Sequence, residues 1–346
     1  MLAADAFAGT RTVGYLDTAT YGLPPKEAVL AVEEALRGWR EWENWSRWEA
    51  DGEACRRLFA GIVGARAEEV ALVSAVSVAA GIIAASLAAR PGDNIVAYEH
   101  EFQSALFPWL LLERRGIEVR LRGLDDLAGS VDARTRLVAV STVQSADGRV
   151  ADLDALRETG APVFLDATQA AGALPIDLDG VDFLAAGAYK WLLCPRGLAF
   201  LYVRGDRLPE IEPLLAGWKS IEDVYERYYG LPMTLTEGAR RLDTSLPWFL
   251  AAGARPSLEL IAELGPERIA AHDLALAARF CAGLEIPETG SPIVQVAVAD
   301  SDVAVDRLRS AGIKCAARAG ALRFAFHLYN DETDADRAIE ILEAGP

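Results

Sequence analysis

The sequence predicts an α/β protein, with a large domain on a mainly parallel seven-stranded sheet and a small C-terminal α+β domain. From Glu69 onward, short apolar runs alternate with stretches of helical periodicity, which is typical of a parallel sheet covered by helices on both faces. After Trp248 the pattern changes to a long helical region followed by strands and shorter helices. We therefore expect an N-terminal arm with an active-site loop (1–22), a large domain (23–247) and a small domain (248–346).

The first predicted element is helical and covers residues 25–62. Its apolar side chains recur at three- and four-residue spacing. Four tryptophans also recur at every third position, namely Trp39, Trp42, Trp45 and Trp48. We expect them to form a helix face that is buried in the fold or in a dimer interface.

Seven apolar runs are the candidate strands of the large sheet. They are Val70–Val73, Asn94–Ala97, Glu118–Leu121, Leu137–Ser141, Val163–Asp166, Phe183–Ala186 and Ala199–Val203. Helical patterns lie between most of them, including Ala75–Leu87 and Gln103–Arg115. Ligands of such sheets bind beyond the carboxyl ends of the strands.

The small domain is predicted from the remaining pattern. Its elements are a helical region Trp248–Leu284 broken near Gly265-Pro266, a strand Ile293–Val298, a helix Ser301–Ala311, a strand Leu322–His327 and a last helix opened by Asn330 or Asp331. An active site between the two domains is expected.

Composition excludes several classes of function. Lys and Arg number 34 against 51 Asp and Glu, a net charge of −17, which disfavours nucleic acid as a partner. We find no signal peptide and no membrane span, so a cytoplasmic location is expected. The four cysteines are too far apart for a zinc site or a disulfide framework, and Cys55 and Cys281 are expected to be buried.

The sequence lacks several common catalytic and nucleotide-binding motifs, namely the dinucleotide-binding, Walker, GxSxG and HExxH motifs. The histidines His100, His272 and His327 lack the spacing of a metal site or triad, so we expect them to be structural or solvated.

One pair of residues carries chemistry. Asp166 ends a buried strand, and Lys190 follows another short strand 24 residues later. Burial favours the neutral amine of a lysine, which is the form that Schiff-base chemistry needs. A carboxylate at a strand end pairs with a protonated pyridine nitrogen. On these residues alone, an ordinary surface lysine is an equal alternative for Lys190.

The chain resembles the class V aminotransferase-type enzymes, which include cysteine desulfurases, kynureninases and isopenicillin N epimerase-like proteins. The likeness starts at Tyr15-Leu-Asp-Thr-Ala-Thr-Tyr-Gly22 and runs almost to the C-terminus. Its most specific part is Asp166-Ala-Thr-Gln169 followed by Tyr189-Lys-Trp-Leu-Leu-Cys-Pro-Arg-Gly197. This resemblance implies fold type I, pyridoxal 5′-phosphate (PLP) as cofactor and Lys190 as the Schiff-base lysine.

The resemblance also implies which residues hold the cofactor ring. Asp166 matches the residue at the pyridine nitrogen, and Gln169 the residue at the phenolic oxygen. Thr142 falls where the family often places a residue near that oxygen. Phe102 matches the kynureninase residue that stacks on the ring, and its alternative is an ordinary core phenylalanine.

The phosphate is expected at Ala75-Val76-Ser77, where a strand turns into a helix. Unpaired N–H groups and the helix dipole favour an anion there, although Val76 departs from the usual Gly-Thr-Thr-like run. Tyr189 and Trp218 resemble kynureninase positions that reach the phosphate, the second from the partner subunit. A homodimer with shared active sites is therefore expected.

The resemblance places the substrate α-carboxylate at Arg323, whose planar guanidinium suits a bidentate contact. Pairing of Arg323 with a protein acid is the alternative. Thr20 and Tyr21 are expected to line the same pocket. The loop that carries the sulfur-accepting cysteine of desulfurases is missing, because Ile313-Lys-Cys-Ala-Ala-Arg318 runs almost directly into Arg323. Cys315 is therefore expected to be a buried structural thiol.

The expected reaction begins with removal of the Cα proton of an amino acid by Lys190. We favour a subsequent C–S cleavage or β-elimination, as in a desulfurase. The alternatives are a true aminotransferase or epimerase, an enzyme for a larger secondary-metabolite amine, and a non-catalytic relative that only binds.

Overall fold

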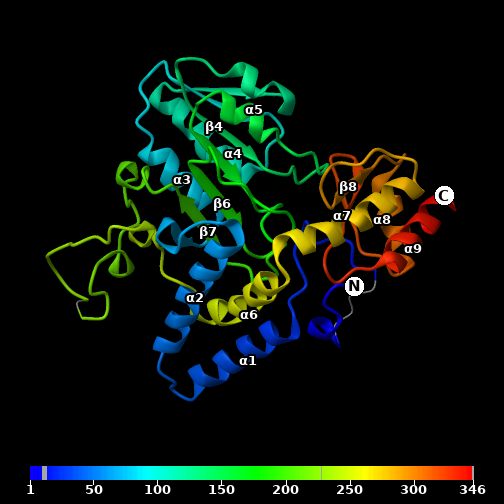
Figure 1. Ribbon diagram of the computed structural model, residues 1–346, viewed down its shortest axis with the longest axis horizontal. Coiled ribbons are helices and arrows are strands. Elements are labelled where there is room, and N and C mark those ends of the chain that lie inside the picture. Colours follow the sequence, from blue (N-terminus) through cyan, green and yellow to red (C-terminus); the bar gives the residue numbers. More distant parts are fainter. Residues whose placement is uncertain (10–13, 227, 345–346) are drawn as a thin grey trace.

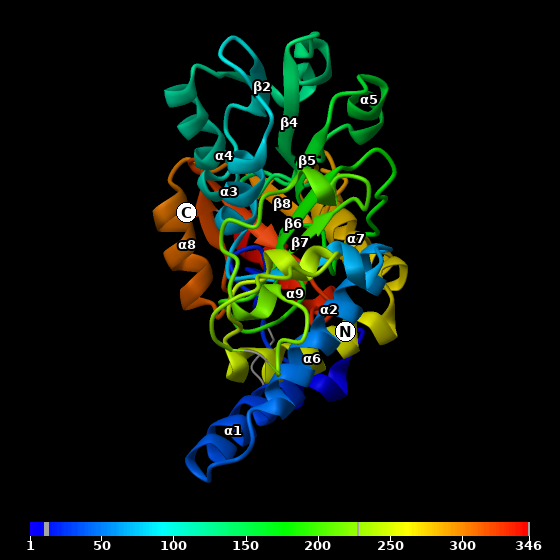
Figure 2. The same cartoon turned by 90° about the vertical axis from the view of Figure 1, so that its left-hand side faces the viewer.

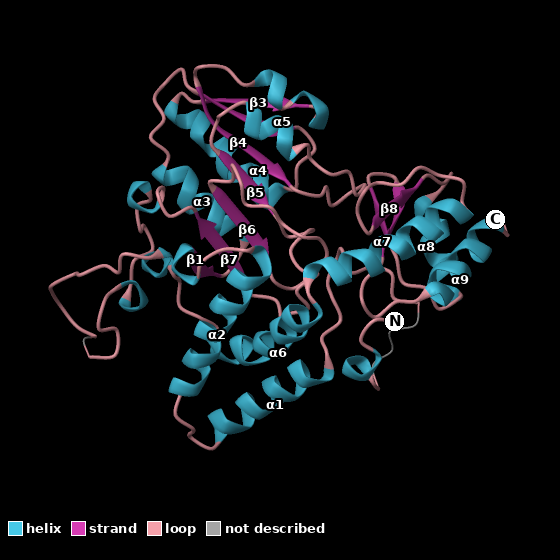
Figure 3. Cartoon of the chain, in the orientation of Figure 1, coloured by secondary structure: helices cyan, strands magenta, loops and turns pink. Residues whose placement is uncertain are grey.

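The computed structural model describes residues 1–9, 14–226 and 228–344, and a seven-stranded sheet forms its centre (Figure 3). Its strands are β1 (Val70–Val73), β2 (Asn94–Tyr98), β3 (Glu118–Arg122), β4 (Thr135–Ser141), β5 (Val163–Asp166), β6 (Phe183–Gly187) and β7 (Ala199–Val203). Their order is β1-β7-β6-β5-β4-β2-β3. Neighbours from β6 to β3 are parallel, whereas β7 is antiparallel to both β6 and β1. All seven predicted strands and the mainly parallel sheet are confirmed.

Helices cover both faces of this sheet. Alternate residues of β1 enter opposite cores: Val70 and Leu72 one, Ala71 and Val73 the other, as the two-residue period of a strand requires. The second core is closed by α3 (Val76–Ser86) and α4 (Gln103–Leu110), which continues as a 3₁₀ turn to Arg115. The first core receives side chains from α2 (Ser46–Val63), α5 (Leu153–Glu158) and α6 (Trp248–Leu264).

The helical region predicted over residues 25–62 is confirmed, except that a turn divides it into α1 (Lys26–Arg40) and α2. Trp42 has a positive φ of 66° at this turn and is 93 % exposed, whereas Trp48 is 3 % exposed. Residues three apart advance by about 300° on a helix, so every-third-residue spacing drifts around the helix. The four tryptophans therefore do not share a buried face.

A smaller antiparallel sheet, in the order β8-β10-β9, forms the C-terminal part of the molecule (Figure 1). Its elements are α7 (Pro266–Gly283), β8 (Ile293–Val296), α8 (Ser301–Ser310), β9 (Ala316–Arg318), β10 (Ala321–Ala325) and α9 (Glu332–Glu343). The predicted break before Pro266 is confirmed, with Gly265 at a φ of 79°. Asp331 is the N-cap of α9, and its side chain accepts from Thr333 N. Strand β9 begins directly after Cys315.

The two ends of the chain tie these parts together. Tyr15 and Asp17 make single bridges to Lys314 and Ala325, so the N-terminal arm lies along the small sheet. Helix α6 packs on α1 and α2, while α7 packs on α9; Figure 2 shows α1 extending away from the sheets. The boundary expected at residue 247 remains a prediction. Among the described residues, no helix combines the length and apolar character that a bilayer crossing requires.

Candidate active site

A cavity of about 150 Å³ lies at the carboxyl ends of β5 and β6. This is where a mainly parallel sheet binds ligands. Seven of the predicted site residues line it, namely Ala75, Val76, Phe102, Asp166, Gln169, Tyr189 and Lys190. Residues that are more than 100 positions apart in the sequence therefore meet at one point.

Lys190 is held in the loop after β6 and is 5 % exposed. Desolvation lowers the pKa of Lys190 to about 8, Asp166 opposes this shift, and Arg323 and Arg318 add to it. Positive neighbours and burial both disfavour the ammonium form. The alternative of an ordinary surface lysine is therefore wrong, and a substantial part of this amine is neutral near physiological pH.

Asp166 ends β5 and supplies the carboxylate of the cavity. Its Oδ1 accepts the Thr168 N–H at 2.9 Å, and the side chain is 5 % exposed. Burial raises the pKa of Asp166, while Thr168 and the nearby Lys190 act in the opposite direction. A buried carboxylate of this kind gains from a cationic partner such as a protonated ring nitrogen.

The N-terminus of α3 supplies hydrogen-bond donors for an anion. The N-cap residue Ala75 has no side-chain capping bond, and Ser74, Ala75 and Val76 all line the cavity. The first N–H groups of a helix lack intrahelical acceptors, and the helix dipole favours negative charge there. Arg196 also lines the cavity, with its guanidinium 5.1 Å from the ring centre of Tyr189.

Two aromatic rings flank the lysine. The Lys190 Nζ lies 5.5 Å from the centre of the Phe102 ring and 5.8 Å from that of Tyr189. Phe102 is 48 % exposed and lines the cavity, so it is not an ordinary core phenylalanine. Its open face is available for stacking on a flat cofactor ring.

Gln169 is fixed by three hydrogen bonds. Its Oε1 accepts from Trp191 Nε1 at 2.7 Å, and its Nε2 donates to Ser145 Oγ at 3.0 Å and to Ala19 O at 3.1 Å. Thr142, by contrast, does not line the cavity, and its Oγ1 is buried without a hydrogen-bond partner in the described structure. Its backbone N–H instead donates to Asp166 O at 3.0 Å.

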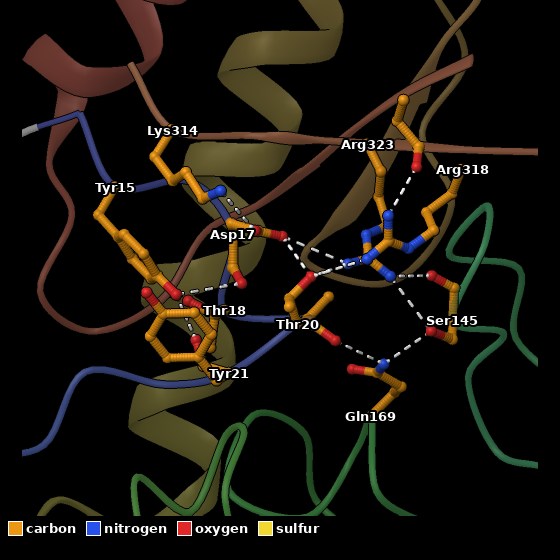
Figure 4. A network of polar contacts seen from close by, with 12 residues as sticks. Tyr15, Asp17, Thr18, Thr20, Tyr21, Ser145, Gln169, Lys314, Arg318 and Arg323 are labelled. Carbon is orange, nitrogen blue, oxygen red and sulfur yellow. Dashed lines mark hydrogen bonds and ion pairs between the residues drawn. The ribbon is translucent and has the colours of Figure 1, made fainter. Parts of the chain in front are cut away.

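Arg323 on β10 lies beside the cavity in a buried polar network (Figure 4). It donates to Ser145 O at 2.6 Å and to Thr20 Oγ1 at 2.6 Å, and it pairs with Asp17 Oδ1 at 3.3 Å. The Nε of Arg323 is buried and has no partner in the described structure. Burial lowers the pKa of Arg323, which Asp17 opposes. The alternative of pairing with a protein acid is thus present, but one donor is left over.

The comparisons with known proteins agree with this geometry. The family model described as aminotransferase class-V matches residues 15–305. The chain belongs to the class V aminotransferase family. Class V aminotransferases are PLP-dependent enzymes, and the buried lysine, the carboxylate and the uncapped helix N-terminus fit that cofactor.

Relatives of this class V enzyme carry several names. It is 30 % identical over 313 residues to the uncharacterized aminotransferase YcbU of Bacillus subtilis, covering 84 % of this chain and 83 % of the relative. It is also 30 % identical over 285 residues to a probable cysteine desulfurase of Methanothermobacter thermautotrophicus, covering 76 % and 70 %.

The fold is shared with solved structures. A cysteine desulfurase of Thermococcus onnurineus superposes with a TM-score of 0.85 at 24 % identity, covering 99 % of this chain and 96 % of that one. The cystine C–S lyase C-DES superposes with a TM-score of 0.88 at 22 % identity, covering 98 % and 100 %. Fold type I is confirmed.

Other predicted site residues of this class V enzyme lie outside the cavity. Ser77 faces a groove between α3 and α4, and Thr20 and Tyr21 line a separate pocket that reaches Tyr189. Trp218 packs edge-on against Trp45 at 6.2 Å, within one chain. Its expected role in the partner's site remains a prediction.

The expected burial of Cys55, Cys281 and Cys315 is confirmed. All four cysteines are buried, and desolvation raises the pKa of Cys315 to about 12. His327 is buried, whereas His100 is exposed. The described residues contain no cluster of three or more His, Cys, Asp or Glu side chains that suits a metal ion.

Sequence reasoning missed residues that organise the site from behind. Ser145 bridges Gln169 and Arg323, and Asp17 pairs with Arg323. Buried Glu101 accepts from both the N–H and the hydroxyl of Ser141 at 2.6 Å. Asp17 lies inside the Tyr15–Gly22 stretch of family likeness, which was a usable signal, whereas no local pattern singles out Ser145.

Proposed function

We propose that Lys190 binds PLP covalently and then takes a proton from the Cα of a primary amino acid, and that the reaction continues as C–S cleavage or β-elimination. One observation carries this proposal: a buried lysine with a lowered pKa faces a buried carboxylate and an open aromatic ring in one cavity. A neutral amine at this point is both a nucleophile and a base.

Different residues of the cavity are expected to bind different parts of the cofactor. PLP supplies an electrophilic carbon and an electron-accepting ring when bound. We expect Asp166 to pair with the ring nitrogen and Phe102 to stack on the ring. The N–H groups at the start of α3 are expected to bind the phosphate. Gln169 is expected to donate to the phenolic oxygen, and Tyr189 to border the phosphate end.

Arg323 is proposed to bind the substrate α-carboxylate. A carboxylate that enters here replaces the 3.3 Å contact with Asp17 and gains the unpartnered Nε. Satisfying a buried unpaired donor favours binding. Thr20, which donates to Asp17 and accepts from Arg323, sets the orientation of the guanidinium.

A lyase reaction is favoured over transamination by two facts. Relatives of this chain are named cysteine desulfurases, and C-DES is a cystine C–S lyase. All four cysteines are buried, so no enzyme thiol is placed to accept sulfur. We therefore propose that sulfur leaves with the product, as sulfide or a low-molecular-weight persulfide.

An amino-acid panel with cysteine, cystine and alanine tests this function. A lyase releases pyruvate, ammonia and sulfide or persulfide without any keto-acid acceptor. A true aminotransferase turns over only when a keto acid is added, and an epimerase gives only the enantiomer. A larger, pathway-specific amine as substrate predicts that Arg323→Ala leaves turnover of that amine nearly unchanged. A protein that binds no PLP under any condition is a non-catalytic binding relative.

We also propose a cytoplasmic homodimer. Large apolar side chains are exposed on α1 and α4, including Val29, Leu30 and Phe107. An apolar surface of this kind is the material from which a subunit interface is built.

A further inference from the structure

A histidine of the C-terminal part is bonded to the peptide that follows Lys190. His327 lies just after β10 and is fully buried, as is Asp273 on α7. His327 Nδ1 lies 2.7 Å from Asp273 Oδ2, and Nε2 lies 3.0 Å from the backbone oxygen of Trp191. One imidazole ring therefore joins the small-sheet side of the molecule to the lysine loop.

The partners of this ring decide its protonation. A peptide oxygen only accepts hydrogen bonds, so Nε2 donates to Trp191 O. Asp273 accepts on both oxygens, from His327 Nδ1 and, at 2.9 Å, from His272 Nδ1. An imidazole that donates from both nitrogens carries a positive charge, which the buried Asp273 carboxylate balances.

Trp191 connects His327 to the cavity, because its carbonyl contacts His327 and its indole N–H donates to Gln169. Its carbonyl is tightly enclosed, because a Cβ on Gly172, which has a φ of 92°, would lie 2.6 Å from Trp191 O. Its indole N–H is a donor only, so the bond at 2.7 Å turns the Gln169 amide oxygen toward Trp191. The amide NH₂ of Gln169 must then point toward Ser145 and the cavity.

We propose that His327 is a positioning residue of this active site. Its ring, held by Asp273, donates from Nε2 to the Trp191 peptide and so sets both the Lys190 loop and the donor side of Gln169. This inference rests on the proposed function, because it assumes that Gln169 and Lys190 meet PLP. His327 itself touches neither the cavity nor its contents.

Two variants separate this role from a purely structural one. Asp273→Asn replaces the carboxylate by an amide that accepts from His272 and donates to Nδ1. His327 then becomes neutral but keeps its Nε2–H bond to Trp191. Asp273→Asn combined with His327→Leu removes that bond without leaving a buried unpaired charge. The two proteins therefore differ chiefly in whether the residue at position 327 donates a hydrogen bond to Trp191 O.

The readouts are PLP affinity, by quenching of tryptophan fluorescence, and imidazole N–H signals of the apoprotein by NMR. We expect Asp273→Asn to bind PLP within about threefold of the wild type and the double variant to bind roughly tenfold more weakly, because the hydrogen bond that holds the Trp191 peptide is lost. NMR of the wild type should show two ring N–H protons on His327, and Asp273→Asn one.

A third variant, Trp191→Phe, serves as the test if the double variant does not fold. It keeps the ion pair of His327 and Asp273 but removes the indole N–H that orients the Gln169 amide, so it should also weaken PLP binding. Equal PLP affinity of the single and double variants, or of Trp191→Phe and the wild type, overturns the inference while leaving the proposed function intact. A wild type that binds no PLP overturns the proposed function instead, and the NMR signals then decide the charge of His327 alone.

Discussion

Lys190 lies in surroundings that disfavour its own charge. It is 5 % exposed, and Arg323 and Arg318 act on it in the same direction as burial. Asp166 and, less strongly, Asp17 favour the ammonium form. The balance places the pKa of Lys190 near 8, so that a modest change in its environment decides whether the amine is a base or a cation.

Attachment of PLP to the apoprotein should follow this pKa. Only the neutral amine attacks an aldehyde, so the rate should rise with pH, reach half its maximum near the pKa of about 8, and then level off. An unshifted lysine would continue to gain rate up to about pH 10. Stopped-flow absorbance from about pH 6 to about pH 11 measures this, because that range covers both pKa values.

Asp166→Asn is the matched control for that profile. It removes the charge that raises the pKa of Lys190, so the midpoint should move to lower pH. A midpoint that stays in place, or moves up, contradicts the electrostatic account of Lys190.

At this scale the sequence predicted some residues well and others not at all. Asp166 and Lys190 follow strands that are apolar throughout, so strand ends alone indicate where they meet. The contact of Arg323 with Asp17 depends on how the N-terminal arm lies along β10. Such a contact between distant segments leaves no local pattern. Thr142 was carried over by position, although its side chain is buried outside the cavity.

Helix α3 begins without a side-chain cap, which leaves its first N–H groups open to the cavity. A capped helix is more stable by about 0.5–2 kcal/mol. The missing cap is thus consistent with a site that reserves these donors for a ligand anion rather than for the helix itself.

Ala75→Asp should therefore stabilise the apoprotein and weaken PLP binding. The new carboxylate caps α3, which raises the thermal midpoint, but it repels phosphate at the same place and should raise the PLP dissociation constant about tenfold or more. Ala75→Ser caps without charge and is the control, with an affinity within about threefold of the wild type. Equal PLP affinity in all three proteins contradicts phosphate binding at α3.

A buried ion pair joins α2 to the edge of the sheet. Arg56 donates to Asp243 at 2.6 Å and to Val70 O at 2.6 Å, and Leu72 N–H donates to Asp243 at 2.8 Å. Burial raises the pKa of Asp243 even beside Arg56. Arg56 also pairs with the less buried Glu53 at 3.0 Å, so Asp243 is the fully buried half of its counter-charge.

Asp243→Asn should lower the free energy of unfolding by about 1–3 kcal/mol, because the buried Arg56 loses its buried carboxylate partner and keeps only the less buried Glu53. Urea unfolding of the apoprotein measures this. Asp306→Asn is the control, since the Arg309–Asp306 pair is exposed, with side chains 63 % and 73 % accessible, and such pairs contribute about 0–1 kcal/mol. Similar losses in both variants contradict the role of the buried pair.

The strands and most helices were predictable because their apolar periodicity is local. The turn between α1 and α2 was not, since Trp42 lies in a run that is helical by composition. There, Glu43 N–H bonds back to Gly38 O at 2.8 Å and Asn44 accepts from Ser46 N. The packing of α2 on α6, far apart in sequence, decides the direction in which the chain leaves this turn.

The whole molecule carries a net charge of −17, while its cavity collects Lys190 and Arg196 with Arg323 and Arg318 nearby. Anionic ligands are thus drawn by local cations and the α3 dipole rather than by the overall field. Within one chain, Trp218 contacts only the aromatic rings of Trp45 and Tyr228 among the described ring pairs. Its expected role lies in the site of a second subunit, so a substitution of Trp218 tests for that subunit directly.

Mixing Lys190→Ala and Trp218→Ala subunits tests whether sites are shared. In a mixed dimer, the site that keeps Lys190 receives an intact Trp218 from its partner if the residue acts across the interface. Activity should then rise above the sum of the two separate preparations after unfolding and joint refolding. Activity equal to that sum contradicts sharing, and a monomer by light scattering contradicts the dimer.

The most direct measurement is the visible absorbance of the freshly purified protein before and after borohydride reduction, followed by peptide mapping. We predict a near-violet band that bleaches on reduction, with the pyridoxyl group on Lys190 and no labelled peptide in Lys190→Ala. A label on another lysine contradicts the assignment of Lys190. Absence of any band after PLP is added contradicts the enzyme itself and favours a relative that has kept the fold without the chemistry.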